Sequence, residues 1–183
     1  MRPAEPNRST LPCWVQYCEL CKYCAPDVSV ASAAAERIIK SDHYLAQLMH
    51  PNFPDLANRF LCAALVLQMT GNDHDAFWNV MYAAWASDDL DNRIAAQLCR
   101  RRASRQLNEI LEQGGNLGSQ LGTEIVVLID LMRRSGSGAE AMAASHKYLD
   151  RAHGSHVLGA IKLERQLITA GDDRSHRWGE VTT

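Results

Sequence analysis

The stretch that decides the fold is DLANRFLCAALVLQM, residues 55–69. On a helix with 3.6 residues per turn, its apolar side chains fall on nearly all sides of the axis. A helix that is apolar all round is normally buried among other elements. Pro54 stands in the first turn, where its missing N–H costs nothing. We therefore expect a buried central helix, with Leu61 and Leu65 in the core.

Helical patterns continue on both sides of this stretch. Apolar residues recur at helical spacing over residues 28–40, and Ser41 is placed to cap a short helix over residues 44–49. After the central helix, residues 73–86 form another helical pattern. The next helix is expected to begin at a capping Ser87 and to reach Gln113.

The last third of the chain is also helical in pattern. A strongly apolar helix is expected over residues 119–134. Its β-branched run has no second strand-like run to pair with, so we do not interpret it as a strand. Ser137 and Glu140 form a capping-box pattern for a helix that reaches His153, and a further helix ends at Gly171.

Together these patterns predict an all-α fold. The chain has 183 residues, which is typical of one domain. We expect a flexible arm over residues 1–12, a helical domain over residues 13–171 and a disordered polar tail over residues 172–183. The domain is an irregular helical bundle of about eight helices, with a short helical-repeat-like stack as the alternative arrangement.

The composition of the chain argues against nucleic acids and membranes as partners. Charged residues make up 22% of the chain and the net charge is −2, so no global field favours nucleic acid or an anionic membrane. The longest apolar runs, Phe60–Leu67 and Ile125–Ile129, are far shorter than the ~20 residues that span a bilayer. The N-terminus lacks the apolar run of a signal peptide. We therefore expect a cytoplasmic protein, away from membranes, whose six cysteines are thiols.

Four cysteines near the start have the spacing C-x4-C-x2-C-x2-C: Cys13, Cys18, Cys21 and Cys24. Such runs occur in metal and cluster sites. However, no helix breaker stands between the first and the last, so we predict a cysteine-rich N-terminal helix. Such a helix would separate its ends by about 16 Å, too far for one tetrahedral zinc site. Core packing is therefore the preferred interpretation, and a metal or redox site is the alternative.

One aromatic stripe and one basic cluster are the candidate partner-binding residues. Their members are Trp78, Tyr82 and Trp85 at i, i+4 and i+7, and Arg100, Arg101, Arg102 and Arg105. The aromatic stripe is typical of core packing, although Trp and Tyr also dominate binding hot spots. The arginines are typical of a solvated helical face; protein contact and nucleic-acid binding are the alternatives.

Signatures of the common enzyme classes are missing from the sequence. We therefore expect a non-enzymatic protein-interaction module of the adaptor, secretion-chaperone or immunity type. It needs no cofactor, and its partner is an unidentified protein or a second copy of the chain. A metal or redox protein that uses the four cysteines is the first alternative. A helical nucleic-acid binder that uses the arginines is the second.

Overall fold

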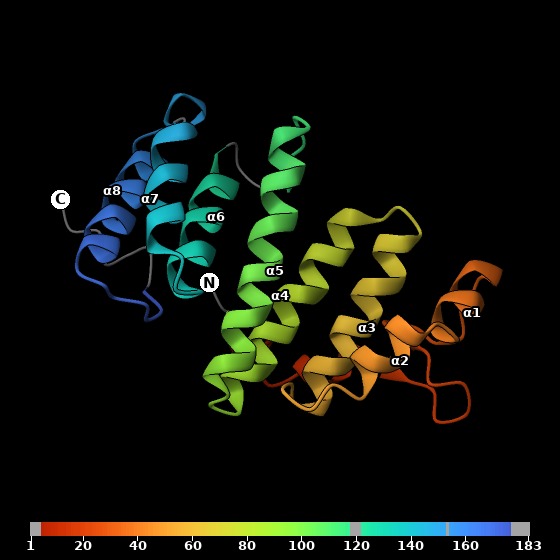
Figure 1. Cartoon of the computed structure of the whole chain (residues 1–183). Coiled ribbons are helices and arrows are strands. Elements are labelled where there is room, and N and C mark those ends of the chain that lie inside the picture. The colour runs from red at the N-terminus through yellow and green to blue at the C-terminus, as the bar shows by residue number, and fades with distance from the viewer. Residues whose placement is uncertain (1–4, 118–121, 153, 177–183) are drawn as a thin grey trace. The chain divides into compact units, whose positions relative to one another are not determined.

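A computed structural model describes residues 5–117, 122–152 and 154–176. Residues 1–4 of the expected arm, residues 177–183 of the expected tail, and residues 119–121 and 153 at predicted helix ends lie outside the described residues. The elements are shown in Figure 1.

The described residues form eight α-helices, which confirms the all-α prediction. The helices are α1 (Ala33–Ile39), α2 (Asp42–Leu48), α3 (Asp55–Met69), α4 (Asp73–Asp89), α5 (Arg93–Glu112), α6 (Thr123–Arg134), α7 (Gly138–Lys147) and α8 (Ser155–Thr169). Two short 3-10 turns, η1 (Leu11–Cys13) and η2 (Leu149–Arg151), accompany them. The expectation of no strand is wrong, because β1 (Gln16–Tyr17) pairs antiparallel with β2 (Cys24–Ala25).

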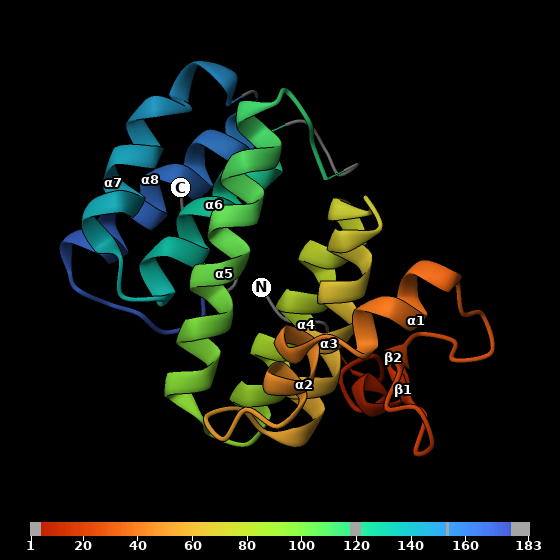
Figure 2. The same ribbon diagram turned by 45° about the vertical axis from the view of Figure 1, so that its right-hand side comes forward.

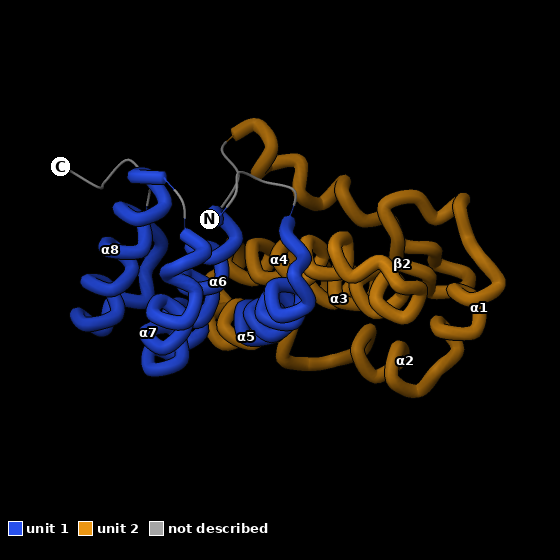
Figure 3. Tube along the Cα trace, turned by 90° about the horizontal axis from the view of Figure 1, so that it is seen from above, with its two compact units in different colours: residues 1, 100–183 blue, residues 2–99 orange. Residues whose placement is uncertain are grey.

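The chain divides into two compact units, which Figure 3 colours separately. Unit 2 comprises Arg2–Cys99 and unit 1 comprises Arg100–Thr183. The boundary falls inside α5, so this helix contributes its first turns to unit 2 and the rest to unit 1.

Unit 2 is built around α3. This helix packs along α4, and α1, α2 and β2 contact it as well (Figure 2). Every residue from Phe60 to Val66 is buried. Leu61 and Leu65 are among them, which confirms the predicted central helix and its core residues. The reason is the one visible in the sequence: a helix with apolar side chains on all sides is stable only when other elements surround it.

Unit 1 contains α6, α7 and α8, each of which contacts the other two. The apolar run of α6 is buried in the core of this unit, and Ile161 of α8, a helix that contacts α6, is buried as well. Among the buried polar residues of this unit, Arg133 of α6 and Glu164 of α8 form an ion pair with a contact of 2.6 Å. Arg133 is therefore a core residue despite its charge.

Side-chain caps account for several helix starts. Ser32 caps α1 by accepting the N–H of Ala35, so this helix starts later than predicted. Ser41 accepts the N–H of Tyr44 at 3.3 Å, which confirms the predicted cap of α2. The capping box expected at Ser137 is wrong, because that side chain makes no cap hydrogen bond.

The predicted break at Ser87 is also wrong. Helix α4 continues through it to Asp89, because the Ser87 hydroxyl donates to the carbonyl of Ala83 one turn earlier instead of capping a new helix. The chain turns at Asp91, whose φ is 53°, and Asn92 caps α5 by accepting the N–H of Ala95. Ser and Asn both favour caps, and local sequence does not decide between them.

Candidate thiol site

The predicted cysteine-rich helix over residues 13–24 is wrong, because the segment is a β-hairpin. Tyr17 pairs with Cys24, and the Cys18 N–H donates to the Tyr23 carbonyl at 2.9 Å. Lys22 closes the turn with a left-handed backbone (φ 67°) and donates its N–H to the Cys18 carbonyl at 2.8 Å. Aromatic residues such as Tyr17 and Tyr23 favour strands, which is the local signal for this hairpin.

The turn contains two cysteines. Cys21 is exposed and Cys18 is half-buried. The N–H of Cys21, the thiol of Cys21 and the N–H of Leu20 all hydrogen-bond to the Cys18 sulfur and lower the pKa of its thiol, and the Lys22 ammonium group acts in the same direction. A thiolate is the nucleophilic form of cysteine, so this arrangement favours a reactive Cys18.

A second pair of thiols lies in the core of unit 2. Cys24 of β2 and Cys62 of α3 are both fully buried, and the Cys62 thiol donates to the Tyr44 carbonyl at 3.8 Å. The side chains of Cys62 and Tyr44 and the positive charge of Arg59 lower the pKa of the Cys24 thiol, while burial opposes them. Cys62 was missed in the sequence because it stands alone, 38 residues after its partner.

The hairpin is attached to the helices by polar and aromatic contacts. The buried Tyr44 hydroxyl accepts the N–H of Cys24 at 3.0 Å and donates to the carbonyl of Lys22 at 2.9 Å. The Arg59 guanidinium lies 4.8 Å from the centre of the Tyr17 ring. Helices α2 and α3 thus fix both the turn and one strand, so the positions of the turn thiols depend on residues far away in sequence.

Replacing Tyr44 with phenylalanine should lower the free energy of unfolding by about 1–3 kcal/mol, because the buried N–H of Cys24 loses its acceptor. Chemical denaturation measures this loss. Tyr17→Phe is the matched control: its ring is only half-buried, and we expect a change below about 0.5 kcal/mol. An equal loss in both variants would show that the Tyr44 hydroxyl does not hold the hairpin.

The four cysteines therefore occupy three different environments. Cys13 is exposed in η1, Cys18 and Cys21 share the turn, and Cys24 is buried beside Cys62. The predicted single stripe of Cys18, Cys21 and Cys24 is wrong, because the turn separates them. Within residues 5–117, 122–152 and 154–176, no three side chains of His, Cys, Asp or Glu are grouped so that they could hold a metal ion.

The aromatic candidates are packed together. Tyr82 contacts the rings of Phe60 and Trp14 edge-on, at 5.5 and 5.0 Å between centroids, and it also contacts Trp78 and Trp85. Trp85 is buried, whereas Trp78 and Tyr82 are half-buried. Burial raises the pKa of the Tyr82 hydroxyl. The three aromatic side chains therefore pack mainly against other residues of unit 2.

The arginine candidates do not share one exposed face. Arg100 is buried and Arg102 is half-buried. Arg101 and Arg105 are exposed, and Arg101 donates to the carbonyl of Ser135 at 3.1 Å. The structure thus leaves two of the four guanidinium groups on the surface of unit 1.

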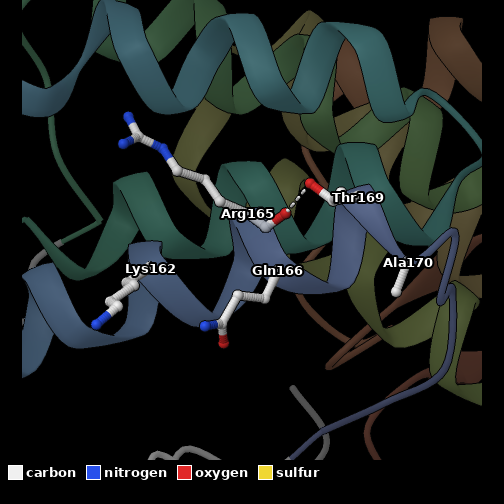
Figure 4. A pocket seen from close by; sticks show the side chains of 5 residues that line it. All are labelled: Lys162, Arg165, Gln166, Thr169 and Ala170. Carbon is white, nitrogen blue, oxygen red and sulfur yellow. Dashed lines mark hydrogen bonds between the residues drawn. The ribbon is translucent and has the colours of Figure 1, made fainter.

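A surface depression follows α8 in unit 1, as Figure 4 shows. Its lining residues are Lys162, Arg165, Gln166, Thr169 and Ala170. The Thr169 hydroxyl donates to the carbonyl of Arg165 at 2.8 Å within the helix. Four of the five lie on α8 and Ala170 is its C-cap, so in the described part of the chain the depression is lined by one helix and its end.

Comparison with protein families, with curated proteins and with solved structures finds no match to this chain. None of the helices in the described part of the chain has the length and apolar character needed to cross a membrane.

Proposed function

We propose that this chain is a thiol-redox protein in which Cys18 and Cys21 alternate between a dithiol and a disulfide. The observation that carries the proposal is the placement of both cysteines in one accessible turn, which the hydrogen bond from the Lys22 N–H to the Cys18 carbonyl closes at 2.8 Å. The lowered pKa of the Cys18 thiol favours it as the nucleophile, and Cys21, three residues later in the same turn, is the candidate to resolve the product.

The reaction is a thiol–disulfide exchange with a low-molecular-weight or protein disulfide. The Cys18 thiolate attacks one sulfur of that disulfide, forms a mixed disulfide and releases one thiolate. The Cys21 thiolate then attacks the Cys18 sulfur and releases the second thiolate. One external disulfide is thereby reduced to two thiols, while the chain loses two hydrogen atoms. In a reducing compartment such as the cytosol, the resting form is the dithiol.

Incubating the reduced chain with mixtures of reduced and oxidised glutathione should produce an internal Cys18–Cys21 disulfide. Mass spectrometry of peptides detects it as the loss of two hydrogen atoms. Cys18→Ser and Cys21→Ser should abolish it, whereas Cys13→Ser removes an exposed thiol outside the turn and should leave it unchanged. Separate glutathione adducts without the internal disulfide would contradict the proposal.

The same site predicts a pH dependence. Alkylation of Cys18 should have its midpoint at a lower pH in the folded chain than in urea, because the turn stabilises the thiolate and lowers its pKa. Folded Cys18 therefore stays reactive as the pH falls below the ordinary thiol pKa. Peptide-resolved alkylation rates measure this, and coinciding midpoints for the folded and unfolded chain would be the opposite result.

Protein contact is the second candidate function, favoured by an apolar edge of unit 2. Leu90, Ile94 and Leu98 follow one another at spacings of four residues and are 65%, 68% and 37% exposed. Exposed apolar residues grouped in this way are typical of an interaction surface. Ile94→Ser with Leu98→Ser should weaken crosslinking to a partner without loss of helix content. Unchanged crosslinking would rule this edge out as the contact surface.

A further inference from the structure

We infer that the chain forms a symmetric dimer in which the exposed face of α5 packs antiparallel against α5 of a second copy. The inference rests on the second candidate function, protein contact through Leu90, Ile94 and Leu98, and it names the partner as another molecule of this chain. It does not depend on the thiol chemistry of the hairpin turn.

The exposed face of α5 is a continuous stripe along one helix. At 3.6 residues per turn, four exposed side chains between residues 94 and 105 fall within about 60° of one another around the axis. They are Ile94, Leu98, Arg101 and Arg105. The opposite face carries small side chains that are buried: Ala95, Cys99 and Ala103. Because the stripe belongs to one helix, helix geometry alone sets the spacing of its residues.

The chemistry of this stripe changes along the helix. Acidic residues stand at the turn before α5, the apolar residues follow, and the arginines come last. Asp91 is the exposed acidic residue of the turn that lies nearest to the apolar residues, whereas Asp89 is already paired with Arg8. A parallel pairing of two copies would place like charges together. An antiparallel pairing brings the acidic end of each helix to the basic end of the other, and such complementary charges fix the orientation of an interface.

A two-fold axis at the level of residue 96 matches both parts of the pattern. Ile94 stands two residues before this level and Leu98 two residues after it, so each lies opposite the other across the axis. Asp91 stands five residues before it and Arg101 five residues after it, so an ion pair flanks the apolar centre on either side. Arg101 donates to the Ser135 carbonyl, and a guanidinium group has five N–H donors in all.

This self-complementary pattern is what selects a second copy as the partner. A two-fold interface uses the same patch on both subunits, so each residue must suit its own symmetry-related neighbourhood. An apolar centre with a polar rim is also the usual anatomy of a protein interface. The contact is limited to one helix and the turn before it, so we expect a reversible, concentration-dependent dimer rather than a permanent one.

The test is sedimentation equilibrium of the full-length chain over a range of concentrations, with reductant to prevent disulfides between copies. We expect a monomer–dimer equilibrium. Ile94→Ser should weaken it by at least ~100-fold, because symmetry removes the side chain twice and each loss of a buried isoleucine costs about 10-fold. Leu158→Ser is the matched control: this leucine is also exposed on a helix, α8, and its replacement should leave dimerisation unchanged.

Two charge reversals test the antiparallel register. Asp91→Lys places cations opposite each other at both ends of the interface, and Arg101→Glu does the same with carboxylates. Each variant alone should therefore dimerise about 10-fold more weakly than the parent chain. An equimolar mixture of the two should recover the parent affinity, because each new charge then faces its opposite. A lysine suits the left-handed backbone of Asp91, since Lys22 adopts the same conformation.

The inference is overturned if the parent chain stays monomeric at every concentration, or if the mixture dimerises no better than either variant alone. It is also overturned if Leu158→Ser weakens the dimer as much as Ile94→Ser does. The broader contact function fails separately. A monomeric chain that loses its crosslinks to a different protein in Ile94→Ser with Leu98→Ser would remove only the second copy as the partner.

Discussion

Replacing Arg133 with methionine should lower the free energy of unfolding by about 3–5 kcal/mol, the usual loss when one partner of a buried ion pair is removed. The Arg133 side chain is 3% exposed and contacts Glu164 at 2.6 Å and Asp130 at 2.8 Å. It also donates to the carbonyls of Asp172 and Arg174, at 2.6 and 3.0 Å, and so fastens the segment after α8. Urea denaturation monitored by circular dichroism measures the loss.

The substitution removes the ion-pair partner of the buried Glu164 carboxylate. Burial raises the pKa of its carboxyl group, and the negative charge of Asp130 adds to this, although Arg133 opposes both. Without Arg133 the folded chain holds this proton more strongly, while the unfolded chain loses it near the ordinary glutamate pKa of about 4.3. The stability of Arg133→Met should therefore be closest to the parent below about pH 4 and fall further behind it as the pH rises.

Two further variants test whether the loss of stability comes from the buried ion pair or from a general disruption of the fold. Lys147→Met breaks an ion pair of the same length, 2.6 Å to Glu112, but both groups are about half exposed. Its loss should stay below about 1 kcal/mol. Arg133→Met combined with Glu164→Leu removes both charges and should recover part of the loss. A loss for Arg133→Met no larger than that for Lys147→Met would show that the buried pair is not a stabilising element.

The helical part of this fold could be predicted because its causes are local. The apolar run of α3 and the cap at Ser41 act over a few residues, so both are visible in the sequence. The hairpin has causes that are distant in sequence. Tyr44 contacts a backbone group 20 residues away, and Cys24 pairs with a thiol on α3. Without these contacts, residues 13–24 contain no helix breaker, and a helix was the expected local structure.

The candidate site was predicted in part for the same reason. The spacing C-x2-C identified Cys18 and Cys21 as a metal or redox alternative, but an assumed helix separated the thiols along an axis. The hairpin instead places both cysteines in one turn. Arg100 shows the reverse error: it was expected on a solvated helical face, whereas its side chain is buried.

Replacing Phe60 with alanine should lower the free energy of unfolding by about 3–5 kcal/mol, the range for deleting a large aromatic side chain from a core. Phe60 is fully buried on α3, and its ring lies 5.5 Å from that of Tyr82. Tyr82 in turn contacts Trp14, which leads into β1, and Trp85 on α4. The cavity would therefore lie next to the Tyr82 ring, which contacts both Trp14 in the segment before the hairpin and Trp85 on α4.

Phe60→Leu is the matched control, because it keeps an apolar side chain and leaves a smaller cavity, and we expect it to cost less than about 1.5 kcal/mol. Urea denaturation followed by tryptophan fluorescence suits both variants, since Trp14 and Trp85 each contact Tyr82 and report on this region. A loss below about 1 kcal/mol for Phe60→Ala would contradict the prediction, because it would mean that the rings of Tyr82 and Trp14 do not depend on α3 for their packing.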